Sequence, residues 1–273
     1  MIMARTIEKA SKEAQEVSDQ YSKISKHYEY WFKSSWPEPA KIQGKALESV
    51  LRGQGLQGRL RALDLTSGMG TQAIGLAMCG HEVVALDISA GQVERGQKEA
   101  EAIDKALPIE FALGDATHPA DYVSGTFDAI FSFGNSLPLL GSADALRSAL
   151  SDSLKLLNPG GVFLASLRDH TDLRKRQPHL IGSGPVNIDG KKGVWVETGI
   201  WMPDGKHYTS HITFVLNEPR HEEYYYPFPP LAAVTKEEFV DLMKDAGFAN
   251  VSFHEKDEHP EFTCPLFLGK RPE

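Results

Sequence analysis

The stretch Leu63-Asp-Leu-Thr-Ser-Gly-Met-Gly-Thr-Gln-Ala73 decides the fold of this chain. Residues 61–65 form a short apolar run that is typical of a buried strand, and residues 72–80 have a helical pattern. Between them lie Gly68 and Gly70, and glycine lets backbone N–H groups approach a ligand closely because it has no Cβ. The stretch therefore predicts a strand, a glycine turn and a helix N-terminus that together bind a ligand.

Short apolar runs and helical stretches alternate after this motif. Such alternation with short connections is typical of a parallel sheet that is covered by helices on both faces. The sequence thus predicts an α/β fold: a doubly wound, mainly parallel, seven-stranded sheet of the Rossmann-like kind, with N-terminal helices and a β-rich insertion. The strands are expected at residues 61–65, 82–87, 108–113, 127–133, 162–167, 250–254 and 266–270.

The pattern changes after about residue 174. Residues 192–202 and 207–216 alternate with a period of two and are separated by Pro203-Asp-Gly205, which together indicate a β-hairpin. Residues 220–226 are expected to add a third antiparallel strand. We therefore predict a single domain over residues 1–273, composed of an N-terminal helical lid at 1–58, a cofactor-binding core at 60–174, a β-rich substrate cap at 175–230 and the end of the core sheet at 231–273.

The composition disfavours several classes of protein. Lys and Arg number 29 against 37 Asp and Glu, and the resulting charge of −8 repels phosphate backbones, so no nucleic-acid partner is expected. The sequence has no run of about 18 apolar residues, so no membrane span is predicted. Its first residues also lack the apolar core of a signal peptide. Cys79 and Cys264 are too few for a disulfide framework, and no histidine has metal-ligand spacing, so no metal is expected. A cytoplasmic enzyme is predicted, with homo-oligomerisation left open.

The glycine motif alone is ambiguous. Gly68-x-Gly70-x-x-Ala73, followed 19 residues later by Asp87, also satisfies the dinucleotide-binding pattern, so a nicotinamide enzyme or a binding protein without catalysis remains an alternative. Asp87 ends the second strand, where a carboxylate can accept both hydroxyls of a ribose. Asp64 would repel a pyrophosphate but could hold an ammonium group. Asp115 follows the third strand, where an adenine amino group could donate to it.

Together with Pro159-Gly-Gly161, these residues resemble the class I S-adenosylmethionine-dependent methyltransferases, whose glycine loop reads D-x-G-x-G-x-G. Thr66 stands where the first of those glycines is usual. A closer resemblance is to the glycine and sarcosine N-methyltransferases and their small-molecule relatives. It is carried by Gly70-Thr-Gln-Ala-Ile-Gly-Leu-Ala77, Gly134-Asn-Ser-Leu-Pro-Leu-Leu140 and Ser166-Leu-Arg-Asp169.

The resemblance implies S-adenosyl-L-methionine as cofactor and a small-molecule acceptor. In that group an N-terminal Tyr and Trp contact the cofactor, and a basic residue shortly after them holds the methionine carboxylate; Lys45, or else Lys41, matches it here. The implied cofactor-binding residues are Tyr28, Trp36, Lys45, Asp64, Ser67, Gly68, Gly70, Asp87, Ile88, Asp115, Ala116 and Phe133. The implied substrate-binding residues are Tyr28, Trp31, Asn135, Tyr208 and Arg168, the last of which would clamp a carboxylate.

Two departures from the family leave the acceptor open. His170 replaces a tyrosine beside the expected substrate site and could serve as a general base for a hydroxyl, phenol or carbon acid, although a lone histidine is more often simply solvated. The aromatic run at 224–228 could floor a larger, flatter pocket or could be strand packing. We expect N-methylation of a small amine or amino acid by in-line displacement. The alternative is C- or O-methylation of an aromatic metabolite of the indole or phenol type.

Overall fold

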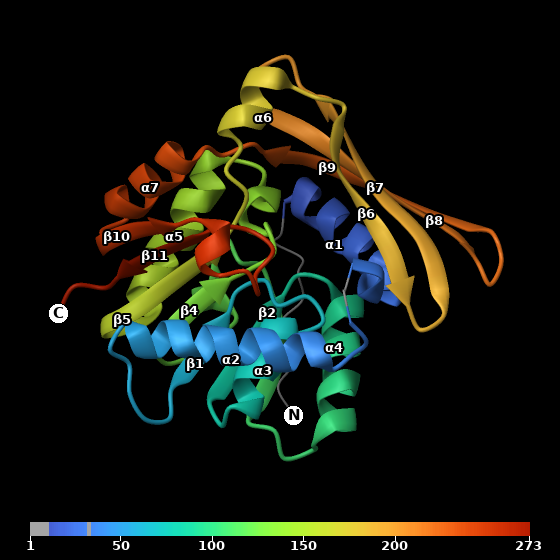
Figure 1. Ribbon diagram of the computed structural model, residues 1–273. Coiled ribbons are helices and arrows are strands. Elements are labelled where there is room, and N and C mark those ends of the chain that lie inside the picture. The colour runs from blue at the N-terminus through green and yellow to red at the C-terminus, as the bar shows by residue number, and fades with distance from the viewer. Residues whose placement is uncertain (1–10, 32–33) are drawn as a thin grey trace.

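The computed structural model describes residues 11–31 and 34–273. Its main sheet has the strand order β10-β11-β5-β4-β1-β2-β3 (Figure 1). The pairs from β5 to β3 are parallel, whereas β11 pairs antiparallel with both β5 and β10. The predicted seven-stranded, mainly parallel sheet is confirmed. Its strands are β1 (Arg61–Asp64), β2 (Glu82–Asp87), β3 (Ile109–Leu113), β4 (Phe127–Ser132), β5 (Leu157–Ser166), β10 (Ala249–His254) and β11 (Leu266–Lys270).

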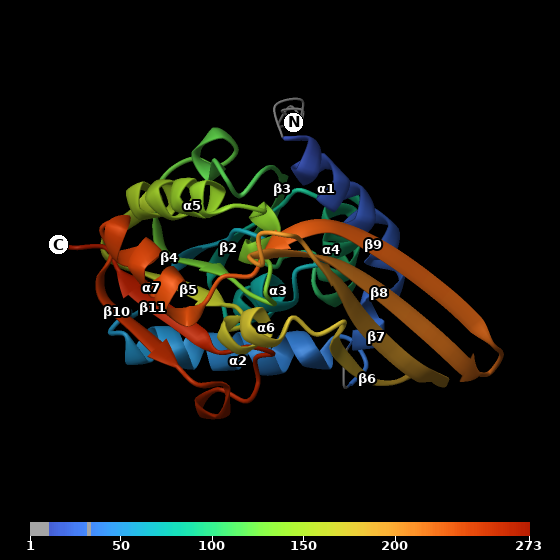
Figure 2. The ribbon, with the colours of Figure 1, turned by 90° about the horizontal axis from the view of Figure 1, so that it is seen from above.

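Helices cover both faces of this sheet, as Figure 2 shows from above. Neighbouring residues of a strand point to opposite faces, so Ala62 packs with α2 and α3 while Leu63 packs with α5 and α7. Both layers are buried, which is why the strands read as continuous apolar runs rather than alternating ones. The helices are α2 (Glu38–Gly53), α3 (Thr71–Met78) and α4 (Ala90–Ile103) on one face and α5 (Ala143–Leu156) and α7 (Lys236–Asp245) on the other.

Helices α2 and α3 approach each other at a pair of glycines, Gly44 and Gly75. A Cβ added at Gly75 would overlap the carbonyl oxygen of Ala40 and lie 2.8 Å from the Cα of Gly44. Backbone atoms cannot move aside as a flexible side chain can. The close contact therefore fixes how α2 lies along α3, and with it the position of every residue that α2 carries.

Gly75→Ala is expected to lower the free energy of unfolding by about 2 kcal/mol, because the added methyl forces two helix backbones apart. Gly53→Ala is the matched control, since Gly53 is also helical and a Cβ there meets nothing within 4 Å. That control should instead raise the free energy of unfolding by about 0.5 kcal/mol, because alanine lowers the conformational entropy of the unfolded chain. Urea unfolding followed by circular dichroism measures both, and equal effects of the two substitutions would contradict the packing described.

A second, antiparallel sheet carries the order β6-β7-β8-β9. The hairpin predicted around Pro203-Asp-Gly205 is confirmed, with Trp201 opposite Tyr208. The first strand of this sheet was not expected, because Gly182, Gly184 and Pro185 interrupt its alternation. The indole of Trp195 occupies the space beside Gly184, where a Cβ would lie 2.6 Å from the indole nitrogen. The strands are β6 (Leu180–Ile188), β7 (Lys191–Trp201), β8 (His207–Glu218) and β9 (Glu222–Ala232), entered through α6 (Thr171–Arg176).

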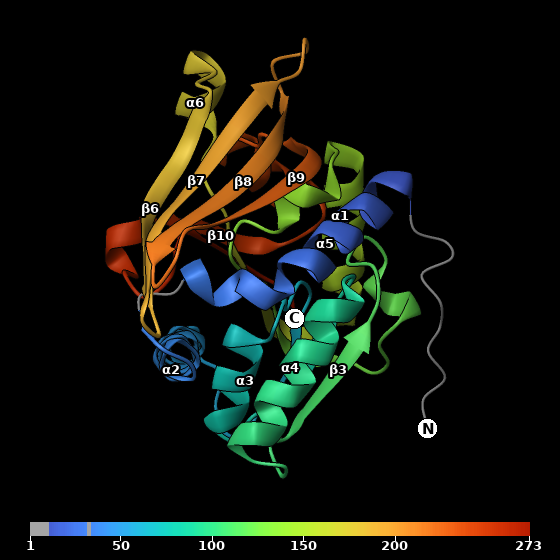
Figure 3. The same cartoon turned by 90° about the vertical axis from the view of Figure 1, so that its right-hand side faces the viewer.

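The helix α1 (Lys12–Ile24) and the 3₁₀ helix η1 (Ser25–Trp31) lie between the second sheet and α4 (Figure 3). Tyr21 packs on Phe228 of β9 with ring centroids 4.9 Å apart. On the other side, the hydroxyl of Ser18 donates to the carbonyl of Ile88 at 2.8 Å. Residues 1–10 and 32–33 of the helical lid predicted at 1–58 lie outside the described residues. The domain boundaries drawn from the sequence stay predictions.

Candidate active site

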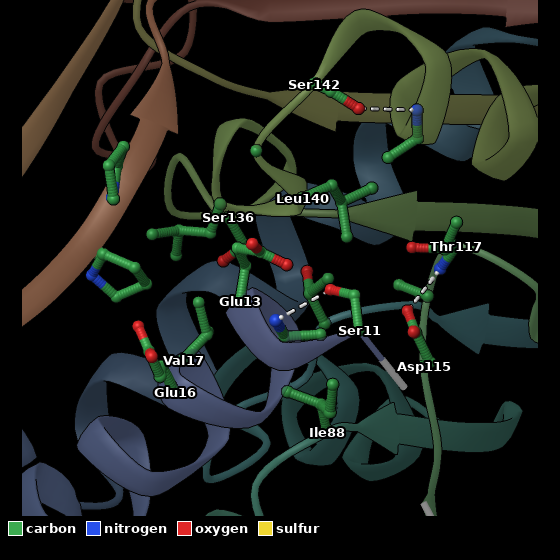
Figure 4. Close-up of a pocket in the computed structure, with 18 of the residues that line it drawn as sticks. Ser11, Glu13, Glu16, Val17, Ile88, Asp115, Thr117, Ser136, Leu140 and Ser142 are labelled. Carbon is green, nitrogen blue, oxygen red and sulfur yellow. Dashed lines mark hydrogen bonds between the residues drawn. The ribbon is translucent and has the colours of Figure 1, made fainter. Parts of the chain in front are cut away.

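A cavity of about 1070 Å³ opens at the carboxyl ends of the parallel strands, beneath α1 and beside the second sheet (Figure 4). Ligands of α/β sheets bind in the crevice at this edge. The sequence-predicted residues that line the cavity are Tyr28, Gly68, Asp87, Ile88, Asp115 and Ala116. These six come from η1 and from the loops after β1, β2 and β3, so the structure brings them to one place.

The glycine loop after β1 is held by the end of β2. The backbone N–H of Gly68 donates to Oδ2 of Asp87 at 2.7 Å, and the N–H of Ser67 donates to the carbonyl of Leu86 at 2.9 Å. Gly70 begins α3 with φ 89°, a left-handed conformation that disfavours side chains. A Cβ there would also lie 3.0 Å from the ring of Phe111. The loop is thus rigid before any ligand binds.

Two acidic side chains face this loop with altered acidity. Burial raises the pKa of Asp87 to about 6, although the N–H groups of Ser89 and Gly68 stabilise its ionised form. Burial also holds the pKa of Asp64 well above its ordinary value, with a smaller contribution from the charge of Asp87. Oδ1 of Asp64 accepts the N–H of Thr66 at 3.2 Å, but its buried Oδ2 has no hydrogen-bond partner. An oxygen of this kind fits a cationic donor that the protein itself does not supply.

Thr66 replaces a family glycine without disturbing the loop. Its hydroxyl shares a 2.6 Å hydrogen bond with the hydroxyl of Ser132, which joins the ends of β1 and β4. Thr66 also lines the cavity. The substitution therefore exchanges backbone freedom for a side-chain contact between neighbouring strands.

Tyr28 lies over the glycine loop. A Cβ at Gly68 would lie 3.6 Å from the hydroxyl of Tyr28. Burial, followed by the charges of Asp87 and Asp64, raises the pKa of Tyr28 to about 12. Trp31 does not line the cavity; it packs edge-on against Tyr28 with centroids 5.2 Å apart and supports that ring from behind.

Six residues assigned to the cofactor by resemblance are not in the cavity wall: Asp64, Ser67 and Gly70 belong to the end of β1 and the glycine loop, and three others lie elsewhere. Lys45 is exposed on α2, next to the Gly44 contact with the middle of α3, and thus far along the helix from the glycine loop. Trp36 packs against the cluster of Ala40, Ile74 and Ala100 on the helical face of the sheet. Phe133 is buried against Phe131 and Phe262. Lys45 thus lies on a helix surface, and Trp36 and Phe133 pack in hydrophobic clusters. These positions do not support direct contact with a ligand in this cavity.

The remaining predicted residues form a second cluster at the end of β5. The backbone N–H of Arg168 donates to Oδ1 of Asn135 at 2.9 Å. The guanidinium Nη2 of Arg168 donates to Glu197 of β7 at 3.4 Å, while its buried Nη1 has no partner. Tyr208 of β8 is fully buried beside this cluster, and burial, with the charge of Glu197, raises the pKa of its hydroxyl.

The surroundings of His170 do not favour the general-base role predicted for it. Its side chain is fully buried, Nδ1 donates to the carbonyl of Val234 at 3.0 Å, and Nε2 faces the hydroxyl of Tyr208 at 3.4 Å. Burial, followed by the charge of Arg168, lowers its pKa to about 4. A neutral imidazole with both nitrogens engaged and such low basicity is a poor proton acceptor near pH 7.

Sequence reasoning missed much of the cavity wall. The missed segments are one face of α1, the loop after β4, the β7–β8 turn and the end of β9. They contribute Ser11, Lys12, Glu13, Ala14, Glu16, Val17 and Tyr21; Ser136, Leu139, Leu140, Gly141, Ser142 and Ala145; Met202, Pro203, Asp204 and His207; and Pro229 and Pro230. Figure 4 shows Glu13, Glu16 and Val17 of α1 near Ser136 and Leu140. No local motif marks these residues, because they meet only once the second sheet and α1 are packed on the core.

Within residues 11–31 and 34–273, no group of three or more His, Cys, Asp or Glu side chains is arranged to hold a metal ion. Over the same ranges, no helix is both long and apolar enough to cross a membrane.

Comparison with known proteins matches residues 62–161 to a methyltransferase domain family. A demethylmenaquinone methyltransferase of Clavibacter sepedonicus is 39% identical over 103 residues, 37% of this chain and 38% of that protein. A tRNA 5-carboxymethoxyuridine methyltransferase of Escherichia coli K12 is 34% identical over 117 residues, 43% of each chain. A glycine/sarcosine N-methyltransferase of Halorhodospira halochloris is 27% identical over 139 residues, 50% of this chain and 48% of that one. The chain spans about two fifths of the length of the first of these relatives.

Solved structures extend the likeness to nearly the whole chain. An amino pentose methyltransferase of Micromonospora echinaspora with S-adenosylmethionine bound aligns with a TM-score of 0.72, covering 91% of this chain and 96% of the other at 17% identity. At that identity the likeness establishes the fold. Residues 62–161 thus match a methyltransferase domain family, and the chain shares the fold of a methyltransferase that binds S-adenosylmethionine.

Proposed function

We propose that the protein transfers a methyl group from S-adenosylmethionine to the nitrogen of a small amine. The observation that carries this proposal is the charge of the cavity wall. Five carboxylates line it, from Glu13, Glu16, Asp87, Asp115 and Asp204, against the single ammonium group of Lys12 among the described lining residues. An acidic wall of low dielectric concentrates cations and disfavours anionic acceptors such as nucleic acid.

The acidic residues around the glycine loop have side chains whose chemistry fits S-adenosylmethionine. In the cavity wall, Asp87 suits the two ribose hydroxyls and Asp115 the adenine amino group. Asp64 is buried next to the wall, and its unpartnered Oδ2 suits the ammonium of the methionine part. S-adenosylmethionine supplies a methyl group on a sulfonium, a strong electrophile that an amine lone pair can attack in line. The nitrogen–carbon bond forms as the carbon–sulfur bond breaks, the thioether leaves with the electron pair, and the methylated ammonium later releases its proton.

An amine acceptor asks little of the protein beyond alignment and exclusion of water. Tyr28 and the rigid glycine loop supply alignment from the cofactor side. Tyr28 and Tyr21, which line the cavity, have electron-rich ring faces that attract cations. The amino pentose methyltransferase with the same fold supports an amine-bearing acceptor.

Methylation of an aromatic ring or hydroxyl is the alternative, favoured by the demethylmenaquinone methyltransferase among the relatives. Two features that suggested it from the sequence have other roles in the structure. His170 is buried and weakly basic. Tyr224 packs on His27 with centroids 3.8 Å apart, and Tyr225 is exposed, so the aromatic run does not line the cavity. The amine is therefore the better supported acceptor.

Methyl transfer is tested with S-adenosylmethionine carrying a tritiated methyl group and a panel of small amines, phenols and indoles. Counts in the methylated product should appear with amines and depend on the protein. Counts confined to phenols or indoles would refute the proposed acceptor class.

Cofactor binding should depend on pH through Asp87. Its pKa of about 6 lies above the ordinary value, so it is protonated at pH 5 and ionised at pH 8. Only the ionised form accepts both ribose hydroxyls, so affinity for S-adenosylhomocysteine should rise as the pH passes through about 6, by up to about tenfold per pH unit below it. Calorimetric titrations from pH 5 to pH 8 measure this rise. The same slope in Asp87→Asn would assign the dependence to another group.

A further inference from the structure

Glu197 is a carboxylate on the inner face of the second sheet, and no motif marks it. Its side chain is only 13% exposed. Oε1 accepts a hydrogen bond from the hydroxyl of Ser210 at 2.9 Å, and Oε2 accepts from Arg168 at 3.4 Å. Burying a charge costs free energy unless it is paired, so a carboxylate held here calls for an explanation beyond packing.

Arg168 is only half satisfied by this partner. Burial alone would lower the pKa of its guanidinium, but the charge of Glu197 raises it overall, so the group stays charged. Nη2 is engaged with Glu197, whereas the buried Nη1 has no hydrogen-bond partner. A buried charged N–H without an acceptor costs free energy, and an acceptor atom of a bound ligand would remove that cost.

Glu197 and Arg168 lie near the same edge of the main sheet as the loops after β1, β2 and β3. Arg168 follows β5, and its backbone is tied to Asn135 at the end of β4. Asn135 directly precedes Ser136, which lines the cavity. Tyr208, beside the pair, packs in one hydrophobic cluster with Leu139, which also lines the cavity. The pair thus lies next to the cavity wall.

We propose that Glu197 and Arg168 together bind the methyl acceptor, and that this acceptor is a hydroxylated amine without a carboxylate. Glu197 accepts an N–H of the amine, and Nη1 of Arg168 donates to a hydroxyl oxygen on a neighbouring carbon. This inference rests on the proposed function and names the substrate class of the same site. It revises the expectation that Arg168 clamps a carboxylate.

The charge of Glu197 disfavours an acceptor that carries a carboxylate. A bidentate clamp uses two parallel N–H donors of the guanidinium, and it would have to share Nη2 with Glu197, which accepts from that nitrogen at 3.4 Å. An incoming carboxylate would also add a second negative charge beside Glu197, next to a cavity whose wall is already acidic. Like charges at such separations in a low dielectric repel strongly. A hydroxyl oxygen satisfies Nη1 without that repulsion.

The carboxylate also favours the reaction itself. The acceptor nitrogen is neutral before attack and becomes positive as its bond to the methyl group forms. Glu197 next to that nitrogen stabilises the developing charge, and its N–H···O hydrogen bond leaves the lone pair free to point toward the methyl group. Glu197 would then act on kcat as well as on KM.

Matched acceptors test the proposal on the unaltered protein. 2-Aminoethanol and glycine differ mainly in a hydroxymethyl or a carboxylate beside the aminomethyl group, and glucosamine and 2-aminocyclohexanol extend the first type. Tritiated methyl transfer should give at least about tenfold higher kcat/KM with the best hydroxylated amine than with glycine. Saturation-transfer NMR of the same amines on the S-adenosylhomocysteine complex gives a readout that does not depend on turnover.

Glu197→Gln keeps the shape of the side chain and removes its charge. We expect at least about a tenfold loss of kcat/KM for the hydroxylated amine, with unchanged affinity for S-adenosylhomocysteine and a smaller discrimination against glycine. Glu223→Gln is the control, because Glu223 is an exposed glutamate of the same sheet, and it should change none of these values. The wild-type comparison stands even if Glu197→Gln fails to fold.

Three results would overturn the inference: preference for glycine, equal discrimination in Glu197→Gln, or no binding of any hydroxylated amine to a protein that binds S-adenosylhomocysteine. Failure to bind S-adenosylhomocysteine is a different result. It would refute the proposed function, and with it the ground on which this inference stands.

Discussion

Asp87→Ala is expected to weaken the binding of S-adenosylhomocysteine by about 100-fold. The carboxylate has two tasks at once in the structure. Its Oδ2 accepts the N–H of Gly68 and its Oδ1 accepts the N–H of Ser89, so it shapes the loop that it helps to line. Removing it costs the ribose its charged acceptor, and one hydrogen bond to a charged group is worth about 1.5–3 kcal/mol.

Glu110→Ala is the control for this loss. Glu110 is an exposed carboxylate on β3, the strand next to β2, so the control removes the same charge from the same part of the sheet without touching the cavity. Isothermal titration of both variants measures the difference. If Asp87→Ala binds as tightly as Glu110→Ala does, Asp87 is not the ribose acceptor.

Asp64→Asn should move stability and binding in opposite directions. The folded protein raises the pKa of Asp64 above its unfolded value, so Asp64 favours folding only at low pH, and this contribution is lost as the pH rises through the folded pKa. Near pH 7 an amide of the same shape avoids the cost of the buried charge. We expect a gain of about 1 kcal/mol in the free energy of unfolding, or roughly 2–4 °C in Tm.

The same substitution should weaken cofactor binding about 30-fold, because the ammonium of the methionine part loses a charged partner worth about 2 kcal/mol. Asp241→Asn is the control, since Asp241 is exposed on α7 and should change neither quantity. Thermal unfolding and calorimetric titration of the three proteins give the answer. A loss of stability in Asp64→Asn would contradict the cost assigned to the buried carboxylate. Binding of S-adenosylhomocysteine as tight as that of the wild type would show that Oδ2 of Asp64 has no cationic ligand.

The cofactor side of the site was readable from the sequence because local chain geometry determines it. Asp87 ends β2, and Gly68 and Asp115 lie in the loops after β1 and β3; the carboxyl ends of parallel strands meet at one edge of the sheet. The hairpin at Pro203-Asp-Gly205 was likewise local, since turn residues and alternation suffice to specify it.

What the sequence could not supply depends on packing between distant segments. The Gly44–Gly75 contact sets how α2 lies along α3, and it leaves Lys45 exposed rather than at the cavity. The burial of His170 follows from the carbonyl of Val234 and the hydroxyl of Tyr208, which approach it from 64 and 38 residues away. Glu197 becomes a candidate site residue only because β7 places it beside Arg168. From the sequence alone, a glutamate in an alternating strand is expected to face solvent.

The most direct test of the account is calorimetric titration of the wild-type protein with S-adenosylhomocysteine and, separately, with NAD. Both ligands carry an adenosine whose ribose suits Asp87, but only the first has an ammonium for Asp64 and lacks a pyrophosphate that this carboxylate would repel. We predict saturable one-to-one binding of S-adenosylhomocysteine and no heat of binding with NAD. Binding of NAD without binding of S-adenosylhomocysteine would contradict the account.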